Sequence, residues 1–355
     1  MTGIPSPSDV PATHRVDVDD SGRARVLWLR TADVCAGVVP ALGGRVLSLA
    51  TKAGEHIFRN PELLNNAIHP AVEIAEVSEE PDGALGRWLN WGGDKTWPAP
   101  QGWSGPSEWP GPPDTVLDGG PYIASWTVDH ARASIEMRSP DDPRTGLRIR
   151  RRAEVTEGTS GYRLTSTFTN TSDREIRWAI WQVVQYPGAR PAPEEATDVG
   201  LGVWVSTGPG PGVSVENLIV GTGQVTVDHS RADVLWVPPQ DVVGKVGFPT
   251  ANGWVAHAEV SRVTALQFAP QPAATYPDRG SRVEVRTTRY RRCRLFRRRT
   301  RARCPSRCLP ARAVGRRLRS VLAARDWKDR AFSIGPVTLA LLDPTGVLLG
   351  EIPLG

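Results

Sequence analysis

Residues 35–50 read CAGVVPALGGRVLSLA, and this stretch sets the pattern for the chain. Two short apolar runs, Cys35 to Val39 and Arg45 to Ala50, lie on either side of the pair Gly43 and Gly44. Short apolar and β-branched runs bounded by glycine turns are typical of β-strands. The stretch therefore predicts a strand, a tight turn and a second strand.

The same pattern recurs over most of the chain. Tyr162 to Thr169 (YRLTSTFT) and Glu175 to Gln185 (EIRWAIWQVVQ) flank the turn residues Asn170 to Asp173. We expect this pair to form a long antiparallel hairpin. Further strands are expected at Ala24 to Arg30, Gly202 to Ser206, Gln224 to Val227, Val234 to Val237, Trp254 to Val260, Ala265 to Phe268, Ser281 to Val285 and Val337 to Asp343.

These runs together predict an all-β fold. Roughly a dozen strands are more than an immunoglobulin-type unit holds, which favours a large antiparallel double-sheet sandwich. The sequence has no internal repeat of fixed period. We therefore expect a single domain over residues 1–355.

Composition places the chain among globular proteins, with 39% hydrophobic and 23% charged residues. No run approaches the roughly 18 apolar residues of a membrane span, so we expect no membrane association. The first residues, MTGIPSPSDVPATH, have neither the basic nor the apolar region of a signal peptide. With only four cysteines, a disulfide framework is not expected, and the chain is predicted to be cytoplasmic.

One segment differs abruptly from the rest. Between Arg286 and Arg319 there are 15 arginines and no Asp, Glu or Lys. Removing these 15 charges from the net charge of +5 leaves −10 for the remainder, so the main body is acidic. The basic character comes from one block, which we delimit as residues 286–325.

Several interpretations of this block remain open. It is a solvated, disordered arm, an arm that binds an anionic partner such as RNA, or the product of a GC-rich gene translated out of frame. Val314, Leu318, Val321 and Leu322 have helical spacing, which allows a short basic amphipathic helix. We do not expect nucleic acid as the main partner, because the rest of the chain is acidic.

The out-of-frame interpretation predicts that another reading frame of the coding DNA over residues 286–325 encodes alternating, strand-like sequence. If neither of the other two frames does so, the interpretation fails. The frames over residues 35–50 serve as the control, since there only the present frame should encode strands.

No metal or cofactor is expected. Cys304 and Cys308 are separated by three residues, but no His lies nearby and the adjacent arginines repel a cation. The sequence also lacks a dinucleotide-binding or Walker loop, a nucleophile elbow and a paired zinc motif.

The stretch from Asn90 to Tyr122 reads NWGGDKTWPAPQGWSGPSEWPGPPDTVLDGGPY and holds four tryptophans. It has neither helical nor strand periodicity, so we expect a long functional loop. Sugar rings stack on aromatic faces while their hydroxyls bond to charged and amide groups. Candidate sugar-binding residues here are Asp94, Trp97, Gln101, Trp103 and Asp118. The alternative is an ordered lid whose tryptophans cover a core.

Three motifs together resemble the galactose mutarotase-like superfamily, and within it a bacterial family of unknown function. They are VVPALGGRVLSL at Val38 to Leu49, NWGGDKTWP at Asn90 to Pro98, and LDGGPY at Leu117 to Tyr122. The resemblance implies an antiparallel β-sandwich that binds carbohydrate across one concave sheet. In its epimerases a Glu base and a His acid open the sugar ring, which recloses as the other anomer. The standard His pair has no match in this sequence.

The resemblance directs attention to ionisable groups outside the loop. Glu284 is the candidate base, and Lys95 or His257 the candidate acid. Arg45, Gln182 and Lys245 are candidate substrate-binding residues, with Lys245 expected in a turn. For each, a structural or solvent-exposed role is the alternative.

We therefore expect a protein that binds a small carbohydrate, with sugar epimerase activity of the aldose 1-epimerase type as one hypothesis. A sugar-binding module without catalysis is the alternative hypothesis. Binding of RNA through the arginine block is a third, and it would weaken steeply with salt.

Overall fold

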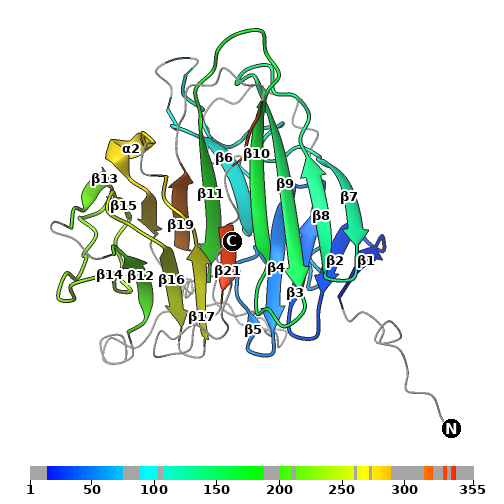
Figure 1. Ribbon diagram of the computed structural model, residues 1–355, viewed down its shortest axis with the longest axis horizontal. Helices are drawn as coiled ribbons and strands as arrows, with labels where there is room; N and C mark the ends of the chain where they lie inside the picture. The colour runs from blue at the N-terminus through cyan, green and yellow to red at the C-terminus, as the bar shows by residue number, and fades with distance from the viewer. Residues whose placement is uncertain are drawn as a thin grey trace, which may run out of the picture.

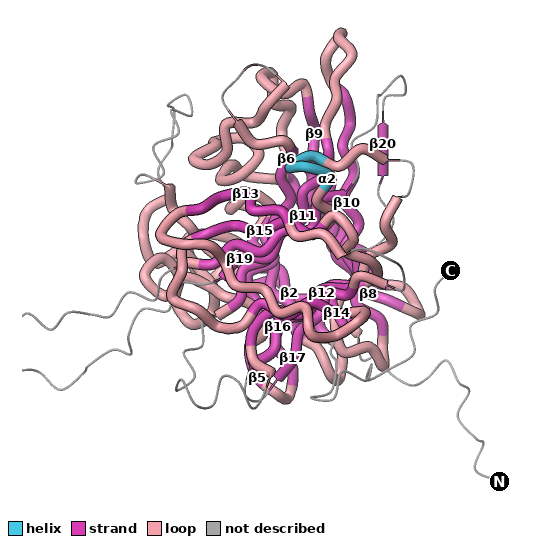
Figure 2. Tube along the Cα trace, turned by 90° about the vertical axis from the view of Figure 1, so that its left-hand side faces the viewer, coloured by secondary structure: helices cyan, strands magenta, loops and turns pink. Residues whose placement is uncertain are grey.

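The computed structural model describes residues 14–74, 88–102, 105, 107–187, 200–208, 213–259, 262–271 and 274–288, and the backbone of 316–322, 331–333 and 337–340. The described strands form two antiparallel sheets packed face to face (Figure 1). In the turned view, β13, β15 and β19 lie in one layer, above β12, β16 and β17 in the other (Figure 2). The predicted all-β double-sheet sandwich is confirmed.

The first sheet has the strand order β1-β2-β3-β4-β6-β11-β19-β18-β15-β13, with β5 paired to β4. Its strands are β1 (Arg15–Asp19), β2 (Val26–Arg30), β3 (Cys35–Val39), β4 (Arg45–Thr51), β5 (Gly54–Glu55), β6 (Asp94–Ala99), β11 (Ala179–Tyr186), β13 (Glu216–Val220), β15 (Gly244–Phe248), β18 (Val283–Thr287) and β19 (Arg316–Leu322).

The second sheet has the order β14-β12-β16-β17-β21-β10-β9-β8-β7, with β20 paired to β10. Its strands are β7 (Ile123–Val128), β8 (Arg132–Arg138), β9 (Leu147–Thr156), β10 (Arg163–Asn170), β12 (Gly202–Ser206), β14 (Val234–Val237), β16 (Trp254–Glu259), β17 (Arg262–Gln267), β20 (Ala331–Ser333) and β21 (Val337–Ala340). A four-residue turn, α2 (Pro277–Gly280), precedes β18.

The predicted hairpin between residues 162–169 and 175–185 is wrong. Both strands exist, as β10 and β11, but β10 pairs with β9 while β11 pairs with β6 and β19. The chain therefore crosses from one sheet to the other after Asn170. The turn residues mark where β10 ends, but they do not specify which sheet receives the next strand.

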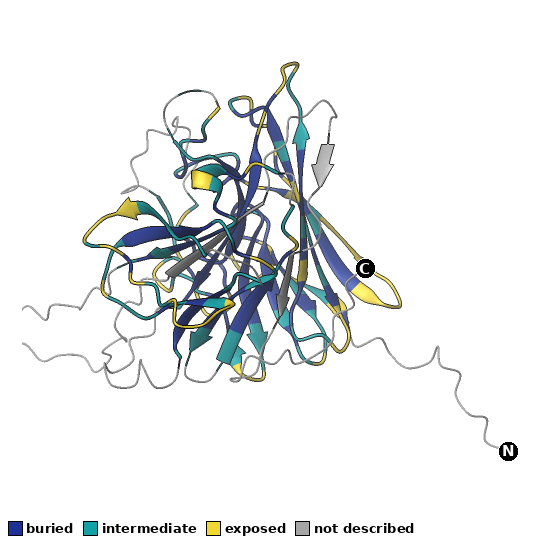
Figure 3. Cartoon of the chain, turned by 60° about the vertical axis from the view of Figure 1, so that its left-hand side comes forward, coloured by how far each residue is buried: buried dark blue, intermediate teal, exposed yellow. Residues whose placement is uncertain are grey.

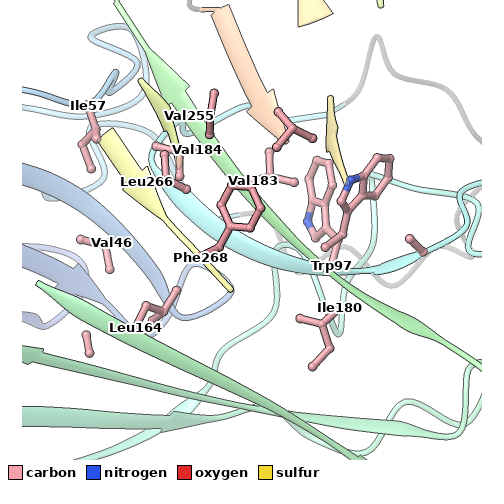
Figure 4. Packing of buried hydrophobic residues seen from close by; sticks show 14 of the residues in the cluster. Val46, Ile57, Trp97, Leu164, Ile180, Val183, Val184, Val255, Leu266 and Phe268 are labelled. Atoms are coloured by element: carbon pink, nitrogen blue, oxygen red, sulfur yellow. The ribbon is translucent and has the colours of Figure 1, made fainter. Parts of the chain in front are cut away.

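Much of the main hydrophobic core lies between the two sheets. Figure 4 shows side chains from both sheets, among them Val184 and Leu266, meeting in this core. A second, smaller hydrophobic cluster lies on the opposite face of β2. Successive side chains of a strand alternate between faces, so Leu27 and Leu29 belong to the main core while Val26 belongs to the smaller cluster. Buried residues follow most of the strands, and exposed ones gather at the turns and along β7 (Figure 3).

Part of the tryptophan-rich stretch is a strand rather than a loop. Asp94–Ala99 forms β6, which is buried along its whole length and pairs with β11 from Ala179 to Val184. Its sequence, DKTWPA, lacks the alternation of apolar and polar residues that marks a half-buried strand. Both faces of β6 are covered, so polar residues occur on each.

The end of the arginine block is also a strand. Arg316–Leu322 forms β19, which pairs antiparallel with β11 on one side and β18 on the other. The helical spacing noted for residues 318–322 therefore does not reflect a helix. Val314, Cys304 and Cys308 lie outside the described residues. No helix of the described residues is long and apolar enough to cross a membrane.

In the turn before β4, Gly43 lies so close to the backbone of Asp118 and Gly120 that only glycine fits. Gly43 has φ of +69°, and its N–H donates to the carbonyl oxygen of Gly120 at 2.9 Å. A Cβ atom on Gly43 would collide with the carbonyl oxygen of Asp118. Gly158 has a similar φ of +74° but open space around it.

We predict that Gly43→Ala destabilises the protein more than Gly158→Ala does. Both substitutions force alanine into the left-handed region, at roughly 1–2 kcal/mol. Only Gly43→Ala adds a collision with backbone, so its loss in urea denaturation should be at least about 1 kcal/mol larger. Equal losses would show that the approach of Gly43 to Asp118 has no energetic importance.

Candidate functional site

Asp94 points from β6 into the space between the sheets. Its carboxylate accepts hydrogen bonds from Arg151 Nη2 at 2.7 Å, from the Tyr162 hydroxyl and from Gln182 Nε2. None of these four side chains is more than 1% exposed. Burial raises the pKa of Asp94, and the Arg151 guanidinium opposes that shift.

A second buried network surrounds Asp118. Its carboxylate accepts from Arg45, from Trp97 Nε1 at 2.9 Å and from Trp88 Nε1 at 2.7 Å. Arg45 also donates to the carbonyl oxygen of Gly92 at 3.2 Å. Arg45 is 0% and Asp118 3% exposed, so this network links β4 to the segment that follows β6.

Four of the predicted sugar-binding residues thus form hydrogen bonds with each other inside the protein. Arg45 donates to Asp118, and Gln182 donates to Asp94. Trp97 is 0% exposed, with its ring centroid 5.1 Å from that of Trp109. Gln101 donates to the carbonyl oxygen of Pro110 at 3.3 Å. Trp103 lies outside the described residues.

Lys95 faces away from the second sheet, because successive residues of a strand point to opposite sides. Its Nζ atom donates to Gln185 Oε1 at 2.9 Å. The same nitrogen lies 5.0 Å from the ring centroid of Trp97 and 5.6 Å from that of Trp88. Contacts of a cation with aromatic faces are favourable, so Lys95 is held in a defined position.

We call this side of the first sheet the outer face. It carries Lys95, Trp97, Trp181, Gln185, Lys245, Glu284 and Arg286 of strands β6, β11, β15 and β18. Val285 pairs with Leu318, which pairs with Val184, the cross-strand partner of the inward-facing Asp94. Val285 therefore faces inward, and its neighbour Glu284 points outward, as the sequence predicted. Lys245 is on β15 and only 6% exposed, so its predicted position in a turn is wrong.

Glu284 and Lys245 form a close ion pair on the outer face. Lys245 Nζ lies 2.7 Å from Glu284 Oε2 and 3.0 Å from Asp278 Oδ2. The same nitrogen lies 4.8 Å from the ring centroid of Trp181. A base and a proton donor in contact are the groups that general acid–base chemistry requires.

The turn that supplies Asp278 is conformationally strained. Asp278 has φ of 51° and Arg279 has φ of 60°, both in the left-handed region that non-glycine residues seldom occupy. Such strain costs on the order of 1–3 kcal/mol per residue and clusters at functional sites. Here the strained turn holds the Asp278 carboxylate against Lys245 Nζ.

His257 lies elsewhere. It is on β16 in the second sheet, and its ring is stacked on Tyr186 with centroids 4.8 Å apart. Tyr186 and Gln182 are an even number of residues apart on β11, so both side chains face the space between the sheets. His257 and Glu284 are thus on opposite sides of the first sheet, and they cannot act on one substrate in this arrangement.

Sequence reasoning missed Trp181 and Arg286 of the outer face, and also Asp278 beside it. Asp278 and Trp181 contact Lys245 from different elements, and no local sequence pattern predicted either contact. Gln182 and Gln185 are three residues apart on β11, so their side chains lie on opposite faces of the sheet.

A cavity of about 490 Å³ lies beside β13, lined by Val215, Asn217, His229 and residues 224–227. It contains none of the outer-face residues. Among the described residues, no three His, Cys, Asp or Glu side chains gather closely enough to hold a metal.

The comparisons with known proteins agree with this geometry. Residues 25–288 match the family described as Domain of unknown function (DUF4380). The chain belongs to this family. Among curated proteins, none matches the chain.

Solved structures show the fold of this DUF4380 member. A galactose mutarotase-like protein from Lactobacillus casei superposes with a TM-score of 0.53 at 10% identity, covering 89% of this chain and 99% of that one. One from Clostridium acetobutylicum gives 0.51 at 9% identity, with 93% and 98% covered. Its fold is therefore galactose mutarotase-like, as the sequence motifs implied.

A longer protein shares the fold as well. A TPR-domain containing protein from Parabacteroides distasonis gives a TM-score of 0.57 at 11% identity. The match covers 97% of this chain but only 56% of that protein, so the chain spans about half its length.

We predict that Asp94→Ala destabilises the protein by about 3–5 kcal/mol, because it leaves the Arg151 charge buried and unpaired. Asp141→Ala is the matched control, since Asp141 pairs with Arg148 at 2.6 Å with both side chains partly exposed. That exposed pair should contribute no more than about 1 kcal/mol. Similar losses in urea denaturation would contradict a structural role for Asp94.

Proposed function

We propose that this protein binds a sugar against the outer face and interconverts its α and β anomers by general acid–base catalysis. Glu284 is the base and Lys245 the acid. The observation that carries the proposal is the contact of Lys245 Nζ with Glu284 Oε2 at 2.7 Å. The galactose mutarotase-like fold supports a sugar as the substrate.

The proton balance of the reaction closes with these two groups. Glu284 removes the proton from the anomeric hydroxyl while Lys245 gives a proton to the ring oxygen, and the bond between that oxygen and the anomeric carbon breaks. Rotation about the adjacent carbon–carbon bond presents the other face of the aldehyde. Ring closure reverses both transfers, so each group ends in its starting state.

Exposure indicates how a sugar would approach. Side-chain exposure falls from 26% at Asp278 to 7% at Lys245 and 0% at Glu284. The strained turn therefore lies at the solvent side of the pair. A sugar entering here meets Asp278 first and displaces its carboxylate from Lys245.

Lys95 has a supporting role in this proposal. It lies on the same face and is fixed by Gln185 and two tryptophan rings. A fixed cation stabilises negative charge on a substrate oxygen as the ring opens. Arg45, Asp94, Asp118 and Gln182 instead maintain the sheets behind the site.

A sugar-binding module without catalysis is the second candidate. The observation in its favour is that Glu284 and Lys245 neutralise each other and are both buried, as a structural ion pair would be. The two candidates differ in whether bound sugar exchanges its anomers.

The proposal predicts that the purified protein accelerates anomer exchange, measured by two-dimensional exchange NMR over free hexoses, pentoses and uronic acids. Glu284→Gln should lower the exchange rate by about 10²–10⁴-fold, since it removes the base. Glu136→Gln is the control, because Glu136 lies on β8 of the second sheet.

Circular dichroism melting of both variants shows whether a loss of activity reflects unfolding. Binding seen as line broadening without exchange would support the non-catalytic module. Exchange that survives in a folded Glu284→Gln variant would contradict the assignment of the base.

A further inference from the structure

Arg286 lies beside the catalytic pair but takes no part in it. It follows Glu284 by two residues on β18, so both side chains point to the outer face. It is also the direct cross-strand partner of Lys245 on β15. Directly opposed residues of antiparallel strands have their Cβ atoms about 4.5–5.5 Å apart, so Arg286 adjoins Lys245.

The environment of Arg286 differs from that of the other buried cations. Arg45 pairs with Asp118, Arg151 with Asp94, and Lys245 with Glu284. Arg286 is half-buried, and no carboxylate among the residues that the structure describes forms an ion pair with it. Burial lowers the pKa of its guanidinium.

Such a position is costly unless an anion completes it. Removing a charge from water without a partner is unfavourable, and proteins normally avoid it. The guanidinium is planar, always charged, and its paired N–H groups match the oxygens of carboxylates and phosphates. A ligand that brings one of these groups to the outer face would supply the missing partner.

We propose that the substrate is an acidic sugar, one that carries a carboxylate or a phosphate group, and that Arg286 binds this group. This inference rests on the proposed function, because it places the sugar ring against Glu284 and Lys245. Arg286 then determines which sugars are accepted, while the acid–base pair acts on the anomeric centre.

The test compares matched sugars with the full-length protein. Glucuronate and glucose 6-phosphate are each titrated beside glucose by isothermal calorimetry, with anomer exchange measured by NMR on the same samples. We expect one acidic sugar to bind at least about 10-fold more tightly than glucose. The comparison of glucuronate with glucose 6-phosphate identifies whether the site accepts a carboxylate or a phosphate.

Arg286→Gln should weaken binding of that acidic sugar by roughly 10- to 100-fold, the range of a hydrogen-bonded charge. Binding of glucose should stay unchanged, which a merely structural role for Arg286 would not produce. Arg286→Lys should recover part of the loss. Arg150→Gln, an exposed arginine 3.7 Å from Glu136 in the second sheet, is the control.

Three outcomes would overturn the inference. If glucose binds as tightly as both acidic sugars, the site does not recognise an acidic group, although the proposed sugar epimerase function still stands. If Arg286→Gln weakens acidic and neutral sugars equally, Arg286 does not select the acidic group. If no sugar of either kind binds or exchanges, both the inference and the proposed function fail.

Discussion

The buried ion pair between Asp94 and Arg151 joins the two sheets, and it fixes which way β6 faces. Asp94 is on the first sheet and Arg151 on β9 of the second, and both are almost completely excluded from solvent. A buried charge that loses its partner is strongly destabilising. A one-residue slip of β6 would turn Asp94 away from Arg151 and separate this pair, so the pair specifies the register of β6.

That constraint determines the outer face. With Asp94 and Thr96 pointing inward, Lys95 and Trp97 must point outward, where Trp97 meets Trp181 at a centroid distance of 6.3 Å. Trp181 in turn lies under Lys245, which pairs with Glu284. The inward network thus positions outward groups on β6, β11, β18 and β15, with β19 lying between β11 and β18. The same strand supplies structural and candidate functional residues because its side chains alternate.

The sequence predicted the fold well because local patterns suffice for it. Cys35–Val39 and Val234–Val237 were predicted as strands with the bounds that the structure shows. The hairpin between β10 and β11 failed because turn residues do not specify the sheet of the next strand. β6 was missed because both of its faces are covered and its sequence therefore shows no alternation.

The site was harder to predict because it depends on contacts across the sheet. Glu284 could be placed outward from its two flanking valines alone. The same alternation in VEVR also placed Arg286 outward, and this signal was available but overlooked. That Lys245 meets Glu284, and that Asp94 and Asp118 serve buried networks, followed only from strand order and register.

The most direct test of this account is a crystal structure of the protein with a bound sugar. The account predicts a sugar ring on the outer face, with the anomeric oxygen within about 3 Å of Glu284 and the ring oxygen within reach of Lys245. A sugar bound instead in the cavity beside β13, near His229, would contradict it.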